Sequence, residues 1–151
     1  MSMEFHVCWQ GERVVESASL GDALRALGFE AKILHEFNGA DGYWPVDMDG
    51  LRTGVEVYFD SDVDELRRNY EVLEAALEGR DRGATFVSHG DSAECGVAIA
   101  LAAALARLFD GIMYEPIEGV IFPMERGVAE AKGMFESARK DGYRDREEEQ
   151  K

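Results

Sequence analysis

The sequence predicts an α+β fold in a single domain, with a mixed or mostly antiparallel sheet packed by about four helices, one of them alanine-rich and central. Short β-prone runs alternate with helical patterns along the 151 residues, a length typical of one domain. The spacing of the strands predicts hairpins as well as crossovers. We assign residues 1–138 to this domain and expect the charged stretch 139–151 to be a frayed tail.

The first part of the chain is expected to hold strands, one helix and a long loop. Arg13–Val15 could extend the first strand into a hairpin. Ser19 is placed to cap a helix that ends at Gly28. Residues 38–50 contain Pro45 and several glycines, show neither a helical nor a strand period, and are predicted to form a loop. The predicted strands here are 5–9, 31–37 and 55–59.

Helices dominate the remainder. An amphipathic pattern begins at Ser61 and continues to Leu77. Asp91 and Glu94 have the spacing of a capping box, in front of an alanine-rich helix that runs to about Phe109. The apolar run in this helix is shorter than a membrane span and predicts a core helix. A last helix is expected over 125–138, and the predicted strands are 84–89, 112–114 and 120–122.

The charge of the chain limits its partners. There are 31 acidic and 16 basic residues, a formal net charge of -15. Such a field repels nucleic acids and anionic membranes and favours a basic protein partner, although it also serves plain solubility. Neither Cys8 nor Cys95 belongs to a CxxC motif and the N-terminus has no signal-peptide pattern, so we expect a cytoplasmic protein.

The sequence indicates no cofactor and no metal. It has no glycine-rich phosphate motif, and the calcium-loop spacing of Asp47, Asp49 and Glu56 lacks its first ligand. His89 and Cys95 could form a Cys–His nucleophile in a small enzyme, and a pair of carboxylates is a further catalytic alternative. The simpler interpretation is a buried thiol and a hydrogen-bonding histidine.

The segment 41–49 combines aromatic residues with acids, which is the usual composition of a protein-binding hot spot. Its acids would complement a basic cleft and accelerate association. The alternative is that Tyr43 and Trp44 fold back over the core. The predicted partner-binding residues are Asp41, Tyr43, Trp44, Asp47, Asp49, Asp60 and Asp62.

The stretch 88–119 joins a turn, an alanine-rich helix and a hairpin. It reads Ser88-His89-Gly90-Asp91-x-x-Glu94, then Ala103-x-Leu105-Ala106, then Asp110-Gly111-x-x-Tyr114-Glu115-Pro116-x-x-Gly119. With Gly54–Tyr58, these motifs resemble small bacterial immunity proteins of polymorphic toxin systems. His89 replaces a tryptophan of that pattern, and Asp110 replaces a glycine.

This resemblance implies a protein that neutralises a toxin, with a nuclease as one candidate because nucleases carry basic surfaces. The leading hypothesis is therefore an immunity protein without catalytic activity. The small enzyme remains one alternative. The other is a self-associating module that uses the alanine-rich helix or an edge strand.

Overall fold

The computed structural model describes residues 3–34, 41–59 and 63–141, and it confirms the α+β prediction. One seven-stranded sheet has the order β2-β3-β4-β5-β1-β6-β7, and every pairing between neighbours is antiparallel. The strands are β1 (Met3–Trp9), β2 (Ala31–Ile33), β3 (Gly42–Met48), β4 (Leu51–Tyr58), β5 (Arg82–Ser88), β6 (Ile112–Glu115) and β7 (Val120–Phe122). The helices are α1 (Ser17–Ala26), α2 (Val63–Asn69), α3 (Leu73–Ala76), α4 (Ser92–Phe109) and α5 (Met124–Lys140).

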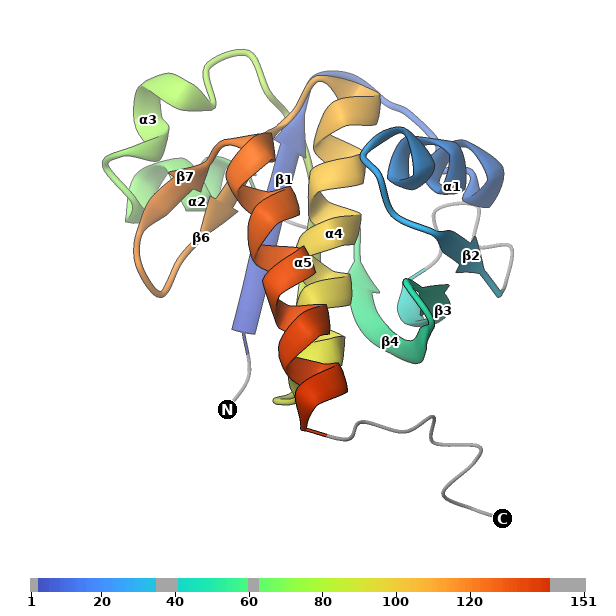
Figure 1. Ribbon diagram of the computed structural model, residues 1–151. Helices are drawn as coiled ribbons and strands as arrows, with labels where there is room; N and C mark the ends of the chain where they lie inside the picture. Colours follow the sequence, from blue (N-terminus) through green and yellow to red (C-terminus); the bar gives the residue numbers. More distant parts are fainter. Residues whose placement is uncertain (1–2, 35–40, 60–62, 142–151) are drawn as a thin grey trace.

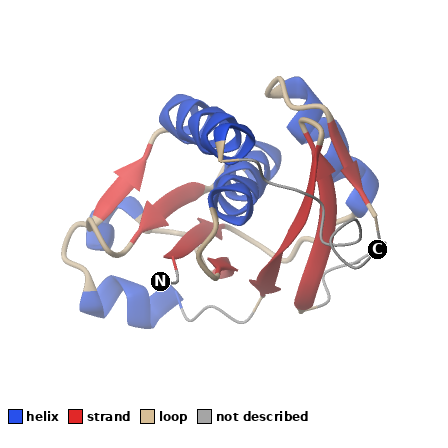
Figure 2. Ribbon diagram, turned by 60° about the horizontal axis from the view of Figure 1, so that its bottom comes forward, coloured by secondary structure: helices blue, strands red, loops and turns tan. Residues whose placement is uncertain are grey.

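Helix α4 is the centre of the molecule, as its alanine content predicts. Figure 1 shows α4 and α5 side by side in front of β1, and Figure 2 shows strands on both sides of this helix pair. Among the described helices, α4 is the one with the length and composition to cross a membrane, but 83% of its apolar window is buried inside the fold. Its alanines allow the sheet, α1 and α5 to approach closely.

The predicted cap of α4 is present with one difference. Asp91 Oδ1 accepts a hydrogen bond of 2.7 Å from the backbone N–H of Glu94. The Glu94 carboxylate reaches back past the cap residue and accepts from the backbone N–H of His89, also at 2.7 Å. Glu94 is buried, so these bonds fix both the start of α4 and the end of the preceding strand.

The prediction that residues 38–50 form a loop is wrong for residues 42–48, because these residues form strand β3. Trp44, Val46 and Met48 alternate into the core, a period-2 pattern that Pro45 obscured. Proline lacks a backbone N–H, which normally weakens a strand inside a sheet. Here the Pro45 carbonyl accepts a hydrogen bond from the backbone N–H of Leu34, which lies one residue beyond the end of β2. The N–H that Pro45 lacks would also point toward Leu34, so its absence removes no hydrogen bond between β2 and β3.

Two other predicted elements also differ. The segment 10–16 contains no strand, although Val15 is buried. Helix α1 begins at Ser17 with Glu16 at the N-cap position, so Ser19 lies inside the helix and does not cap it.

The predicted helix over 61–77 is divided into α2 and α3. Between them the N–H of Leu73 bonds to the carbonyl of Tyr70, a three-residue step that tightens the chain. Tyr70 packs against Tyr114 of β6, with the ring centroids 5.1 Å apart and the rings tilted by 56°. The described residues thus form five helices where about four are predicted. At the other end, α5 runs to Lys140, and residues 142–151 of the expected tail lie outside the described part of the chain.

The two faces of the sheet differ in how far helices cover them. On the inner face, side chains such as Phe5, Val57 and Phe86 are buried in the core that α4 completes. The outer face is covered at one end, where α2 and α3 enclose a second apolar cluster that contains Cys8 and Tyr114. Over β3, β4 and β5 the outer side chains remain accessible, and this is the part of the molecule with functional interest.

Candidate functional site

The accessible outer surface follows from strand alternation and register. Tyr43, Glu56, Val87 and Glu4 are successive cross-strand neighbours on β3, β4, β5 and β1. A second row next to it is formed by Tyr58, Thr85 and His6. Because alternate residues of a strand share a face, both rows point away from α4. We call these residues the open face: Glu4, His6, Tyr43, Glu56, Tyr58, Thr85 and Val87.

Glu56 lies at the centre of the open face and is held by two polar neighbours. Its Oε2 accepts a hydrogen bond of 3.0 Å from the Tyr58 hydroxyl and lies 3.1 Å from Nε2 of His89. The bond from His89, followed by the bond from Tyr58, lowers the pKa of Glu56. Glu56 is therefore a carboxylate at neutral pH, with 35% of its side chain exposed.

Two tyrosines flank this carboxylate. Tyr43 is 48% exposed and Tyr58 is 37% exposed. The Tyr43 phenol lies over Gly54 of the neighbouring strand, in the space that a β-carbon would need. Tyrosines that are anchored at the backbone and open to solvent lose little conformational entropy on binding, which is why such residues dominate protein interfaces.

A second polar cluster crosses β1 and β5. Thr85 Oγ1 lies 3.0 Å from His6 Nδ1, and His6 Nε2 lies 3.5 Å from Glu4 Oε2. Burial lowers the pKa of His6 more than the neighbouring Glu4 raises it. The order hydroxyl, imidazole, carboxylate is that of a nucleophilic triad.

The position of Thr85 argues against nucleophilic catalysis. Thr85 lies inside β5, with His6 of β1 on one side and Tyr58 of β4 on the other. The backbone N–H groups around it are committed to the ladders, so the described residues offer no pair of free donors for an oxyanion. This cluster therefore stabilises the sheet, and its polar atoms form part of the open face.

The alternative based on His89 and Cys95 is also unsupported by the geometry. Cys95 is only 6% exposed, and its thiol donates to Met3 Sδ at 3.3 Å. Burial raises the pKa of Cys95, so the thiolate needed for attack is disfavoured. His89 instead directs Nε2 toward Glu56.

The largest correction to the predicted binding residues concerns Trp44. It is 1% exposed and packs against Phe59 at 5.6 Å and Phe86 at 6.5 Å. Trp44 faces the inside of the sheet because it alternates with Tyr43, which faces outward. Tyr43 therefore lies on the outer face with about half of its surface exposed, and Trp44 is part of the core.

The predicted acids have local structural partners. Asp41 accepts from the backbone N–H of Phe59 at 2.7 Å. Asp47 binds Arg52 with contacts of 2.7 and 3.0 Å, and the bond from Arg52 lowers the pKa of Asp47. Asp49 Oδ2 lies 2.6 Å from Lys132 Nζ. Asp60 and Asp62 lie outside the described residues.

These acids do not converge as a metal loop would require. Asp47, Asp49 and Glu56 each contact a different side chain, respectively Arg52, Lys132 and His89. Within residues 3–34, 41–59 and 63–141, no group of three His, Cys, Asp or Glu side chains could hold a metal ion.

Glu56 and Tyr58 are site residues that the sequence-based choice missed. The alternating pattern of residues 55–59 already placed both on one face of a strand. That face could be identified as the outer one because Val55 and Val57 are apolar.

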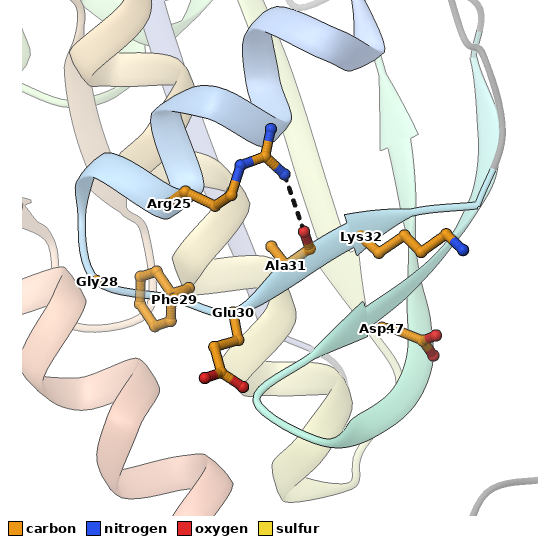
Figure 3. A pocket seen from close by; sticks show the side chains of 7 residues that line it. All are labelled: Arg25, Gly28, Phe29, Glu30, Ala31, Lys32 and Asp47. Carbon is orange, nitrogen blue, oxygen red and sulfur yellow. Dashed lines mark hydrogen bonds between the residues drawn. The ribbon is translucent and has the colours of Figure 1, made fainter.

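A surface pocket lies at the far edge of the sheet, between the end of α1 and β2. Figure 3 shows Lys32 and Asp47 on one side of it and Arg25 on the other. The Arg25 guanidinium donates a hydrogen bond of 3.1 Å to the carbonyl of Ala31, which points outward from the edge of the sheet. This bond satisfies a backbone acceptor that an added strand would otherwise use. The pocket thus surrounds a protected strand edge, and its opposite charges single out no ligand.

No family model, curated protein or solved structure matches this chain. The fold and the site define a small antiparallel α+β protein with a tyrosine- and glutamate-bearing sheet face. Its function is therefore argued from the chemistry of that face.

Proposed function

We propose that this protein is a cytoplasmic inhibitor of the immunity-protein type, which binds a basic toxin domain through the open face and blocks it. The observation that carries the proposal is the pair of exposed tyrosines, Tyr43 and Tyr58, on either side of the Glu56 carboxylate. The net charge of -15 supports a basic partner. A field of this sign accelerates encounter with such a partner and repels nucleic acid.

The sheet is well suited to present a rigid binding surface. The open face spans neighbouring strands whose inner sides are buried against α4, so its side chains start from fixed backbone positions. A preorganised face loses little entropy on association. At the β2 edge, the short strand and the bond from Arg25 to the Ala31 carbonyl disfavour the alternative in which a second chain adds to the sheet there.

The test compares partner capture by three forms of the tagged protein in its own cells. The wild type is set beside Tyr43→Ala/Tyr58→Ala, which removes both open-face tyrosines. The matched control is Val14→Ala/Ile117→Ala, which removes two apolar side chains that are each 65% exposed and lie outside the open face. Any captured protein is then purified and its affinity for the three forms is measured.

We expect one basic partner whose affinity falls as salt rises. The tyrosine variant should lose about 2 kcal/mol or more of binding, the scale of a hot-spot pair, while the control variant binds as the wild type does. Expression of the partner should arrest growth, and the wild-type protein should relieve the arrest. Equal binding by all three forms, or a partner that the protein fails to neutralise, would contradict the proposal.

A further inference from the structure

Glu56 differs from Asp47 and Asp49 in that no lysine or arginine among the described residues pairs with it. Asp47 is paired with Arg52, and Asp49 with Lys132. In the described part of the chain, the side chain that lies against Glu56 at the position of a base is the imidazole of His89, with Nε2 3.1 Å from Oε2 of Glu56. That side chain is 55% exposed, so a ligand can reach its contact with Glu56 from solvent.

The surroundings of Glu56 match the chemistry of a guanidinium group. A guanidinium binds a carboxylate through parallel N–H donors and stacks on an aromatic ring. Glu56 offers the carboxylate, Tyr43 and Tyr58 offer the rings, and Val87 on β5 offers an apolar wall for the methylene stem. A lysine ammonium would gain the charge contact but not the fork geometry or the planar stacking.

We infer that the open face binds an arginine side chain of the protein partner, with its guanidinium on Glu56 and against the flanking tyrosines, in place of His89. The inference rests on the proposed function for the identity of the macromolecule that carries the arginine. Charge complementarity commits the site to this occupant, because the open face contributes two acids, Glu4 and Glu56, and no lysine or arginine.

Free arginine amide tests this site without the partner. The amide and side-chain signals of the full-length protein are followed by NMR while arginine amide or lysine amide is added. The variant Glu56→Gln keeps a side chain of the same shape and a hydrogen-bond acceptor for Tyr58 while removing the charge. The control variant is Glu125→Gln, an acid at the start of α5 that lies outside the open face.

Arginine amide should shift the signals of Tyr43, Glu56, Tyr58 and His89 in a saturable manner, and more strongly than lysine amide. Glu56→Gln should weaken this binding about tenfold, the value of one charge-assisted contact, and Glu125→Gln should leave it unchanged. Shifts spread over the acidic surface, or equal binding by Glu56→Gln, would overturn the inference. Concentration-dependent shifts of the same signals without ligand would assign the face to a second copy of the chain and overturn it as well.

The two proposals fail in different ways. If arginine amide does not bind but the tyrosine variant still loses the partner, the inhibitor function stands and the arginine site is wrong. If arginine amide binds but the tyrosine variant nevertheless binds and neutralises the partner fully, the open face holds arginine but does not block the toxin.

Discussion

The phenol of Tyr43 occupies the space above Gly54, the residue diagonally opposite on the neighbouring strand. A β-carbon at position 54 would overlap the ring and would lie 2.7 Å from the carbonyl oxygen of Trp44. The absence of a side chain at Gly54 thus determines where an open-face aromatic ring lies. An aromatic ring that packs over a glycine in this way also covers backbone that a strand glycine leaves exposed.

Gly54→Ala should destabilise the protein by about 1–3 kcal/mol, because the backbone of β3 has to shift as well as the tyrosine ring. Urea unfolding measures the effect. Gly133→Ala provides the control, since no heavy atom lies within 4 Å of its added β-carbon in the exposed middle of α5. That change should stabilise the helix by about 0.5–1 kcal/mol. Equal effects of the two changes would contradict the packing argument.

Trp44→Ala and Tyr43→Ala should separate stability from binding. Trp44 is buried between two phenylalanines, so its truncation should cost about 3–5 kcal/mol of unfolding free energy. Tyr43→Ala removes a half-exposed ring and should cost much less while it weakens partner binding. Thermal unfolding and affinity measured on the same samples test this. A Tyr43→Ala protein as unstable as Trp44→Ala would place Tyr43 in the core.

Asp49 and Asp110 have the same left-handed backbone, with φ of 52° for each. Asp110→Gly should stabilise the protein by about 1 kcal/mol, because glycine adopts this conformation without strain at the end of α4. Asp49→Gly should destabilise it, because the carboxylate that binds Lys132 and the N–H of Glu30 is lost. Chemical unfolding of both variants gives the signs, and a loss of stability in Asp110→Gly would refute the strain argument.

The free energy of unfolding should decrease in two successive steps as the pH is lowered, one due to His6 and the other due to Glu56. Burial holds the pKa of His6 below its ordinary value of 6.5, so the unfolded chain takes up that proton first. The His6 contribution is complete above pH 6.5 and declines as pH falls through the lowered value. The pKa of Glu56 is likewise lowered from 4.5, so its contribution is complete above pH 4.5 and declines further into acid.

His6→Gln identifies the first window. This variant should show a flatter dependence of unfolding free energy on pH just below 6.5, with the more acidic decline retained. Urea titrations at closely spaced pH values measure the slope. An unchanged slope in His6→Gln would show that another group is responsible.

Both thiols should resist alkylation in the folded protein. Burial raises the pKa of Cys8 to about 12 and also raises that of Cys95. Because the thiolate is the reactive form, labelling at neutral pH should occur only through unfolding and should accelerate in urea. The variants Cys8→Ala and Cys95→Ala report on each thiol separately. Rapid labelling of Cys95 in the native state would revive its role as a nucleophile.

The parts of the fold that could be predicted are those in which local pattern and tertiary environment agree. The alanine-rich helix with Asp91 at its cap is such a case, because burial on all sides and capping chemistry are both visible in the sequence. Strand β3 could not be predicted, since Pro45 and Gly42 are unfavourable in a strand and only the register with β2 and β4 makes them tolerable.

The candidate site was predictable in composition but not in orientation. Adjacent aromatic residues indicate a contact surface, yet only the pleat decides that Tyr43 faces outward and Trp44 inward. Glu56 and Tyr58 share a face because they are two residues apart. The contact between Glu56 and His89 depends on how β4 pairs with β5, and no local sequence pattern determines that pairing.

The position of β1 in the sheet has a consequence for biosynthesis. The first strand of the chain lies between β5 and β6, so both its neighbours are made long after it leaves the ribosome. A nascent chain that ends before Arg82 has a complete apolar N-terminal strand and no partner for it. Contacts of such large sequence separation slow folding and leave apolar surface exposed during translation. Truncated or stalled chains of this protein should therefore depend on chaperones, whereas the finished chain can close its sheet around β1.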